Sequence, residues 1–253
     1  MASKLKEIAE GVHWLPVSIA NVYFVRSGSG WVLIDTSIPN RGQAIRAAAE
    51  ELSDAPPAAI LLTHGHMDHS GSAVELARVW KAPVYVDQAE LEFLDGTKTY
   101  PPPDPSVGGF MAFMSRLFPL RKLNLEGVPQ PFEDGQAIPG LADWESIATP
   151  GHSPGHVSFY RRSDRTLIVG DACVTMDLDS FWAIVTKRQE ISRPPAPITC
   201  NWKAARRSVE ALAALEPRVL ACGHGIPMTG SDTAQKLRAF SEHFPTPIRG
   251  RYV

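Results

Sequence analysis

The stretch Thr63-His64-Gly65-His66-Met67-Asp68-His69-Ser70-Gly71 decides how this sequence is interpreted. It places three histidines and one aspartate within six residues, directly after the apolar run of residues 58–62. A short apolar run followed by polar residues is typical of a buried strand that ends in a loop. Ligands of open α/β folds bind at the carboxyl ends of such strands. Because imidazole and carboxylate together suit a divalent first-row metal, above all zinc, the stretch predicts a metal site.

The composition is that of an ordinary globular protein. A length of 253 residues fits a single domain, residues 1–253, and 44% hydrophobic content is enough for a sizeable core. The net charge of −2 disfavours nucleic acid as a partner. The three cysteines are too widely spaced for a metal motif or a disulfide framework, so we expect reduced thiols and a cytoplasmic location. We expect no membrane partner, because no signal peptide or membrane-length apolar stretch is found.

The hydrophobic patterns predict a mixed α/β chain. Alternating residues predict two adjoining strands at 12–17 and 21–26, and residues 31–34 predict a third strand that ends at Asp35. Further strands are predicted at residues 58–62, 83–86, 145–149, 157–160, 166–169 and 218–222. Helices are predicted at residues 42–52, 70–79, 88–94, 202–215 and 233–244.

Two sets of residues leave alternatives open. The apolar segment 106–118 fits a helix buried against the core, which we favour, or a lid or dimer contact beside the site. Arg188 and Arg193 could be exposed arginines without a functional role, which we favour, or they could bind a carboxylate of the substrate. Six apolar residues fit either a wall for an acyl chain or ring, or part of the core: Phe110, Met111, Phe113, Met114, Phe181 and Trp182.

Metal-competent side chains follow four separate predicted strands. The candidate ligands are His64, His66, Asp68, His69, His152, Asp171 and His224. Zinc takes about four to five donors, so this set is too large for one ion and suits two ions with a carboxylate bridge. We expect His156 beside the ligands or facing substrate, and His13 and His243 in structural or surface positions. Asp35 fits equally a loop cap or a partner that orients a ligand histidine.

With these motifs in their order, the chain resembles the metallo-β-lactamase fold superfamily. The HxHxDH motif is present at residues 64–69, and the later motifs are Gly151-His152, Gly170-Asp171 and Gly223-His224-Gly225. The resemblance covers nearly the whole chain and implies an α/β fold, a four-layer αβ/βα sandwich with metals at one edge between two sheets. Asp35 matches the family's first motif, which favours an orienting role.

The resemblance also implies a ligand assignment. It places His64, His66 and His152 on one metal ion, and Asp68, His69 and His224 on the other. Asp171 would bridge the two ions beside a hydroxide.

Departures from the family's branches narrow the prediction. Class B β-lactamases generally lack the bridging aspartate that Asp171 supplies and are exported, so β-lactam hydrolysis is a further alternative. His66 argues against the flavo-diiron branch, which has glutamate there, and no sequence is left over for the extra domain of the nuclease branch. The pattern looks closest to glyoxalase II-like and lactonase-like hydrolases. The basic glutathione-binding extension of glyoxalase II is not found.

The resemblance implies a hydrolase with two zinc ions, or iron or manganese in their place. Its substrate would be a small molecule with an ester, thioester or lactone carbonyl. The bridging hydroxide would attack that carbonyl, with Asp68 as the catalytic residue that receives or passes on the proton. The alternative from another class is a mononuclear iron dioxygenase that acts on persulfides through His64, His152 and Asp171. A binding module without catalysis is disfavoured by the complete ligand set, and a homodimer is left open.

Overall fold

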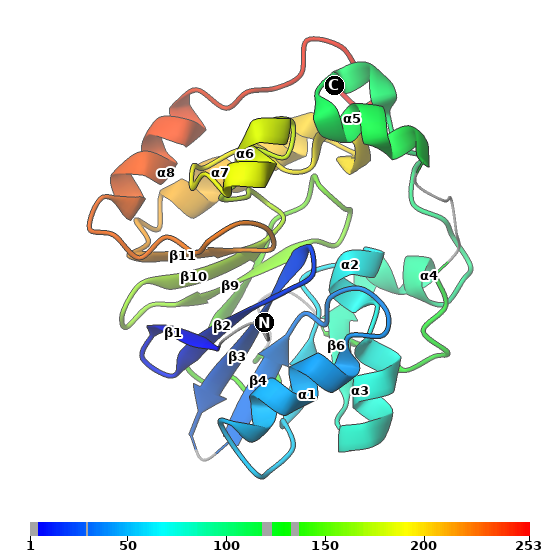
Figure 1. The fold of residues 1–253 in the computed structure, drawn as a ribbon, viewed down its shortest axis with the longest axis vertical. Helices are drawn as coiled ribbons and strands as arrows, with labels where there is room; N and C mark the ends of the chain where they lie inside the picture. The colour runs from blue at the N-terminus through cyan, green and yellow to red at the C-terminus, as the bar shows by residue number, and fades with distance from the viewer. Residues whose placement is uncertain (1–4, 29, 118–122, 133–136) are drawn as a thin grey trace. The chain divides into compact units, whose positions relative to one another are not determined.

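The computed structural model describes residues 5–28, 30–117, 123–132 and 137–253. The chain forms two compact units, each with its own sheet and core (Figure 1). The N-terminal unit comprises Met1–Lys98 and Lys122–Ser146, and the C-terminal unit comprises Thr99–Arg121 and Ile147–Val253. The predicted mixed α/β class is confirmed, and the single domain over residues 1–253 stays a prediction.

The N-terminal unit is built on a sheet of seven strands in the order of the sequence. The strands are β1 (Lys6–Ala9), β2 (Val12–Val17), β3 (Ala20–Ser27), β4 (Gly30–Ile34), β5 (Ala59–Leu61), β6 (Val84–Asp87) and β7 (Pro129–Phe132). Strands β1 to β4 are antiparallel, whereas β4 to β7 run parallel. Ile34 pairs with Leu61, so β4 and β5 end side by side. Asp35 and the histidine motif therefore begin at neighbouring points of one sheet edge.

Helices α1 (Gly42–Glu50) and α3 (Ala73–Trp80) cover one face of this sheet (Figure 1). Alternate strand residues such as Trp31 and Leu33, or Ile60 and Leu62, share a core cluster with the helices' apolar sides. This period of two on the strands is what a single buried sheet face requires. The remaining short helices are α2 (Met67–Ser70), η1 (Gln88–Glu90) and α4 (Leu91–Leu94).

The C-terminal unit is built on four strands in the order β11-β10-β9-β8. They are β8 (Glu145–Ala148), β9 (Val157–Arg161), β10 (Thr166–Gly170) and β11 (Val219–Cys222). Strands β10 and β11 are parallel, with Gly170 opposite Cys222. The helices are η2 (Pro105–Val107), α5 (Phe110–Met114), η3 (Ser115–Leu117), α6 (Phe181–Thr186), η4 (Ala196–Ile198), α7 (Trp202–Ala213) and α8 (Thr233–Glu242).

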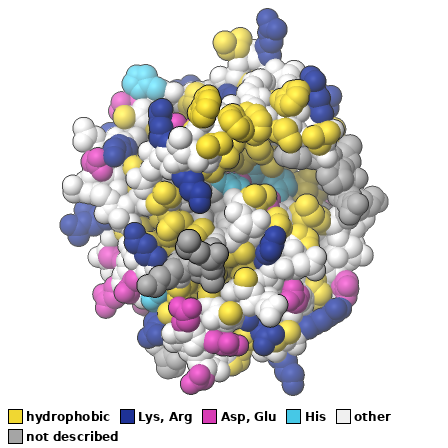
Figure 2. All heavy atoms as spheres, in the orientation of Figure 1, with side chains coloured by type: hydrophobic (Ala, Val, Ile, Leu, Met, Phe, Trp, Pro, Cys, Tyr) yellow, Lys and Arg dark blue, Asp and Glu magenta, His cyan; other side chains and the backbone are white. Residues whose placement is uncertain are grey.

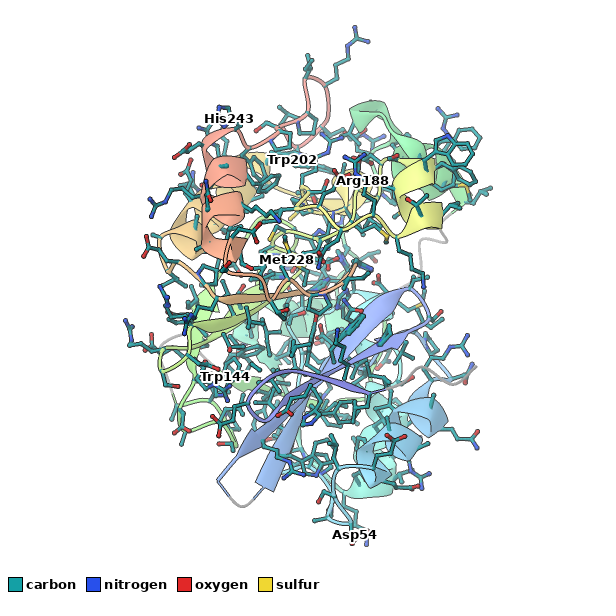
Figure 3. All side chains as sticks on the ribbon, turned by 60° about the vertical axis from the view of Figure 1, so that its left-hand side comes forward. Asp54, Trp144, Arg188, Trp202, Met228 and His243 are labelled. Carbon is teal, nitrogen blue, oxygen red and sulfur yellow. The ribbon has the colours of Figure 1, made fainter. Side chains whose placement is uncertain are left out.

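Trp202, at the start of α7, anchors the second core. Its side chain is 1% exposed and lies in a cluster with Leu167, Leu220 and Leu237 from β10, β11 and α8. Its ring centroid lies 6.2 Å from that of Phe244. Figure 3 labels Trp202 near α8 and His243 at the end of α8. Each unit thus buries one sheet face under its own helices.

The elements that were not predicted include β1, β7 and α6. Strand β7 has the sequence Pro-Gln-Pro-Phe, and proline removes a ladder donor, so it is tolerated at an edge, where β7 lies. Strand β1 is the opposite edge and is mostly exposed, so it shows no buried alternation. These elements are stable because of their neighbours and not because of their own pattern.

The prediction of a buried helix at residues 106–118 is wrong. The structure has α5 and η3 there, and the side chains of Phe113 and Leu117 are 64% and 74% exposed. Phe118 lies outside the described residues.

In the part of the chain that the structure describes, no helix has the length and apolar character needed to cross a bilayer.

Core packing gives a direct test of the N-terminal unit. Phe24→Ala removes a ring that is 1% exposed, so we expect the free energy of unfolding to fall by about 3–5 kcal/mol. Phe113→Ala is the matched control, because its ring is 64% exposed, and a change within about 0.5 kcal/mol is expected. Urea unfolding of both variants measures the difference. Equal destabilisation by the two substitutions would contradict the assigned core.

Candidate metal-binding residues

The four candidate ligands of the N-terminal unit lie at the end of β5 and in the single helical turn α2. The side chains of His64, His66 and His69 are buried, and that of Asp68 is 21% exposed. The His66 carbonyl accepts hydrogen bonds from the N–H groups of His69 and Ser70, both at 2.9 Å. This turn brings His69 back toward the two earlier histidines, with its ring centroid 4.3 Å from that of His64. The sequence predicted a loop here, and the helical turn explains how three imidazoles gather.

Asp35 and Thr63 orient two of these imidazoles. The His69 Nδ1 lies 2.8 Å from the Asp35 Oδ2, and the Thr63 hydroxyl donates to the same carboxylate at 2.9 Å. Since that hydroxyl's only proton is used, it accepts at 3.0 Å from the His64 Nδ1–H. Both histidines therefore carry the proton on Nδ1 and present an Nε2 lone pair, as metal ligands do. The contact predicted between Asp35 and a candidate ligand is confirmed.

The spacing of the ring nitrogens fits a metal ion. The His64 Nε2 lies 3.1 Å from the His66 Nδ1. Two nitrogens bound to one tetrahedral zinc at about 2.0 Å would be about 3.3 Å apart. The Asp68 Oδ2 lies 3.9 Å from the His69 Nε2. The donors are thus imidazole nitrogens and a carboxylate, which suit zinc or iron.

Backbone contacts hold the motif in place, and one of them involves a residue that the sequence did not indicate. The Thr36 N–H and hydroxyl both donate to the His69 carbonyl, at 2.6 and 2.9 Å. The Asp35 backbone has a φ of 59°, a left-handed conformation that aspartate tolerates. The Gly65 N–H donates to the Glu90 Oε2 at 3.0 Å, and Glu90 is fully buried. A lone glutamate in a short predicted helix carries no sequence signal of this role.

The three candidate ligands of the C-terminal unit also lie together. Asp171 follows β10 and His224 follows β11, so the two residues lie at the ends of neighbouring parallel strands. The Asp171 Oδ2 lies 3.1 Å from the His224 Nε2 and 3.5 Å from the His152 Nε2. All three side chains are at most 6% exposed. A carboxylate oxygen between two imidazole nitrogens is suited to bridge metal ions.

The His152 tautomer follows from its neighbour. The Thr199 hydroxyl donates to the Pro195 carbonyl at 2.9 Å and lies 3.2 Å from the His152 Nδ1. With its proton committed, the hydroxyl accepts from His152 Nδ1–H, which leaves the lone pair on Nε2. Gly151, just before it, has a φ of +140° and lies so close to Ala205 that a Cβ would be 2.3 Å from the Ala205 nitrogen. This approach requires glycine.

His156 is not placed as a ligand. Its Nε2 accepts a hydrogen bond from the Asp171 N–H at 2.9 Å, and its Nδ1 lies 2.8 Å from the Thr149 hydroxyl. The lone pair that a metal would need is therefore used to hold the Asp171 backbone. This agrees with the expectation that His156 lies beside the ligands.

The Cys222 thiol is not suited to metal binding or nucleophilic attack. Cys173 and Cys222 are fully buried in the C-terminal core, as expected for Cys173. Burial raises the pKa of the Cys222 thiol well above its usual value, and a hydrogen bond with Cys173 acts in the same direction. The thiol therefore stays protonated, whereas metal ligands and nucleophiles need thiolate.

The two arginines have different surroundings. Arg188 follows α6 (Figure 3), is exposed, and forms an ion pair with Glu190. Arg193 is 17% exposed, and its Nη2 forms an ion pair with Asp179 at 2.8 Å. The expectation that Arg193 is an exposed residue without a role is therefore wrong. His243 is exposed and His13 is half-buried, as expected.

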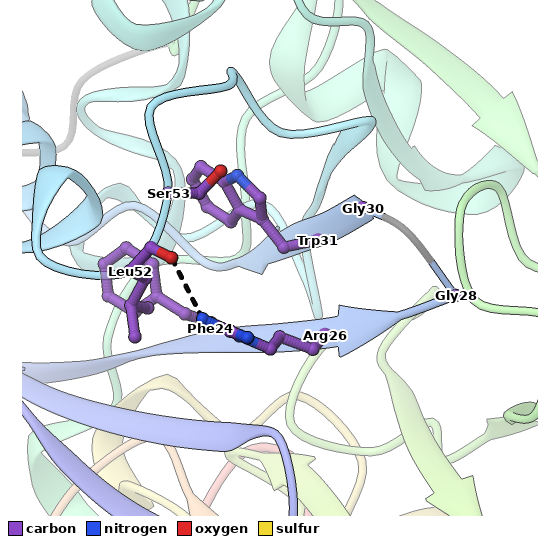
Figure 4. A pocket seen from close by; sticks show the side chains of 7 residues that line it. All are labelled: Phe24, Arg26, Gly28, Gly30, Trp31, Leu52 and Ser53. Carbon is purple, nitrogen blue, oxygen red and sulfur yellow. Dashed lines mark hydrogen bonds between the residues drawn. The ribbon is translucent and has the colours of Figure 1, made fainter.

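A separate pocket of about 130 Å³ lies at the β3–β4 hairpin (Figure 4). Phe24, Trp31 and Leu52 line it, and the Arg26 Nη2 donates to the Leu52 carbonyl at 2.9 Å across it. None of the candidate ligands lines this pocket. Its lining offers no cluster of acids, bases or nucleophiles that suggests chemistry.

The comparisons with known proteins identify the family of this chain. Residues 15–224 match the family model of the metallo-β-lactamase superfamily. A probable metallo-hydrolase of Bacillus subtilis, YflN, is 40% identical over 237 residues, which cover 91% of this chain and 90% of the relative. The hydroxyacylglutathione hydrolase GloC of Haemophilus influenzae is 29% identical over 112 residues, or 44% and 48% of the two chains. The crystal structure of TTHA1623 in a di-iron-bound form matches with a TM-score of 0.55 and 26% identity, over 85% and 94%.

The chain therefore belongs to the metallo-β-lactamase superfamily and has its α/β fold. Within that superfamily it is a metallo-hydrolase with histidine and aspartate side chains that could hold divalent metal ions.

The orienting role of Asp35 can be tested through metal affinity. Asp35→Asn keeps the shape but removes the charge beside His69 Nδ1–H, so we expect zinc affinity to fall about 10- to 100-fold. Competition with a chromophoric chelator measures the dissociation constant. Asp54→Asn, at an exposed aspartate of the same unit (Figure 3), should leave it unchanged. Unaltered affinity in Asp35→Asn would show that its contact with His69 has no influence on the metal.

Proposed function

We propose that the seven candidate ligands bind two divalent metal ions, zinc in the first place. The enzyme would hydrolyse an ester, thioester or lactone carbonyl of a small molecule. The observation that carries this proposal is the orientation of three imidazoles: His64, His69 and His152 each have Nδ1 held by an oxygen, and the Nε2 of each lies beside another candidate ligand. The seven ligands are His64, His66, Asp68, His69, His152, Asp171 and His224. Five imidazoles and two carboxylates exceed the capacity of one ion.

Bound divalent ions lower the pKa of a water ligand to about 7 and polarise a carbonyl oxygen. The chain's own residues supply position and proton transfer. Asp171, between two imidazoles, is the proposed bridging carboxylate, and Asp35 fixes the orientation of His69. Asp68 is the one candidate ligand in its unit with clear solvent exposure, so its carboxylate is suited to accept a proton and pass it to a leaving group.

The substrate class rests on the relatives and on the bridging aspartate. GloC's name specifies hydrolysis of a hydroxyacylglutathione, a thioester, which favours carbonyl substrates of this kind for the present chain. The di-iron form of TTHA1623 supports iron as the alternative metal. All three cysteines are free thiols, which is consistent with the proposed cytoplasmic location.

The function is tested by acid release in a pH-stat. Metal-replete protein is given an aryl ester, a γ-lactone, an acyl-homoserine lactone, a glutathione thioester and a β-lactam, each of which yields a carboxylic acid. We expect one of the first four to be preferred, with activity lost on chelation and restored by zinc. Silence across the panel would overturn the carbonyl-hydrolase proposal, and bound iron with oxygen uptake on a persulfide would replace it by a dioxygenase.

The role of Asp68 is tested on the preferred substrate. Asp68→Ala removes a proposed ligand and proton carrier, and we expect kcat to fall about 10²- to 10⁴-fold. Metal content, measured by mass spectrometry of the purified variant, should also fall. Asp54→Ala is the matched control at an exposed aspartate. Full activity with full metal content in Asp68→Ala would show that the assignment is wrong.

A further inference from the structure

The C-terminal unit exposes an apolar surface on two short helices. This surface, called here the α5–α6 surface, consists of side chains that are 50–74% exposed: Phe113, Leu117, Phe181, Trp182 and Val185. An edge contact between the Phe110 and Phe181 rings, 5.4 Å between centroids, joins the two helices. Figure 2 shows hydrophobic side chains gathered where α5 and α6 lie. Contiguous exposed apolar surface of this kind marks a binding site.

Helix α6 lies within a loop that begins and ends beside candidate ligands of its own unit. The loop, residues 176–189, starts five positions after Asp171. Its ends are closed by Val174 and Ser192, which exchange N–H···O bonds of 3.0 and 2.8 Å. Thr175, at the same point, donates its N–H to the His224 carbonyl at 3.1 Å. The backbone that carries Phe181, Trp182 and Val185 is thus fixed directly to the backbone that positions Asp171 and His224.

A partly buried ion pair holds the α5–α6 surface in place. The Asp179 carboxylate accepts from the Arg193 Nε at 2.9 Å, and both side chains are less than one-fifth exposed. The Asp179 carbonyl accepts from the Phe110 N–H at 2.9 Å, and Gly109 lies against the Asp179 side chain. Arg193 in turn lies 5.6 Å over the Trp202 ring of the core. The exposed rings are therefore fixed in position, and they stay exposed despite the free-energy cost of contact with water.

We propose that the α5–α6 surface binds the alkyl or aryl part of the substrate's acyl group. The inference rests on the proposed hydrolase function and narrows it to carbonyl substrates with a hydrophobic acyl chain. The sequence of α6, Phe-Trp-Ala-Ile-Val-Thr, offers no charge to a polar acyl group. The attachment of its loop beside Asp171 and His224 favours a substrate over a second protein as the occupant.

The inference is tested with aryl esters of acetic, hexanoic and decanoic acid. For the wild type we expect kcat/KM to rise with chain length, by up to about fourfold for each methylene that leaves water. In the double variant Trp182→Ser/Val185→Ser the ratio of decanoyl to acetyl kcat/KM should fall about tenfold. Ile248→Ser, at an aliphatic side chain that is 98% exposed in the same unit, is the control and should leave the ratio unchanged.

A binding measurement separates this inference from the proposed function. Calorimetric titration with decanoate should give heat with the wild type and with Ile248→Ser, and little with the double variant. Ester hydrolysis without dependence on chain length would overturn the inference while the hydrolase proposal stands. Decanoate binding without hydrolysis of any substrate of the pH-stat panel would keep the surface as an acyl site and overturn the hydrolase. A concentration-dependent dimer that the double variant abolishes, with no decanoate heat, would assign the surface to a second copy of the chain.

Discussion

The structure depends on one constraint: imidazole and carboxylate groups that are removed from water need fixed partners. The Asp35 carboxylate meets that constraint in the N-terminal unit. It accepts from His69, from the Thr63 N–H and from the Thr63 hydroxyl, and the hydroxyl in turn fixes His64. One buried carboxylate thereby sets the tautomers of two histidines. The result is a pair of lone pairs that are ready to coordinate before any ion arrives.

The C-terminal unit solves the same problem with different residues. A threonine hydroxyl whose proton is given to a carbonyl fixes His152, and His156 holds the Asp171 backbone. In both units some of these side chains follow neighbouring parallel strands: Asp35 and His64 follow β4 and β5, and Asp171 and His224 follow β10 and β11. Parallel neighbours end at the same edge, so residues far apart in sequence are brought together there.

The loop of residues 176–189, which the pairing of Val174 with Ser192 closes, connects this edge to exposed apolar side chains. Asp179 and Arg193 keep α5 and α6 together, and Arg193 reaches the core through Trp202. A long insertion at a strand end, built on a fixed base, is the usual place where proteins with one fold differ in specificity.

The sequence by itself determined the mixed α/β class, most of the strands and helices, and the metal-competent residues. These features have local signals: period-two and helical patterns, and histidines with aspartate at strand ends. An orienting role for Asp35 could also be predicted, because this residue follows directly after a predicted strand. Edge strand β7, with its two prolines, lacks any such signal, since its hydrogen bonds depend on a neighbour that is distant in sequence.

Only the tertiary structure decided the supporting contacts and the exposure of the apolar helices. Glu90 and Thr199 act on Gly65 and His152 across gaps of 25 and 47 residues. The sequence also suggested that residues 106–118 were buried, whereas Phe113 and Leu117 are exposed. An apolar segment shows that burial is favourable, but whether anything covers it depends on which elements the fold brings beside it. The local sequence motifs therefore indicated which side chains could bind metal. The packing of distant segments determined the tautomers of the histidines and the surroundings of these side chains.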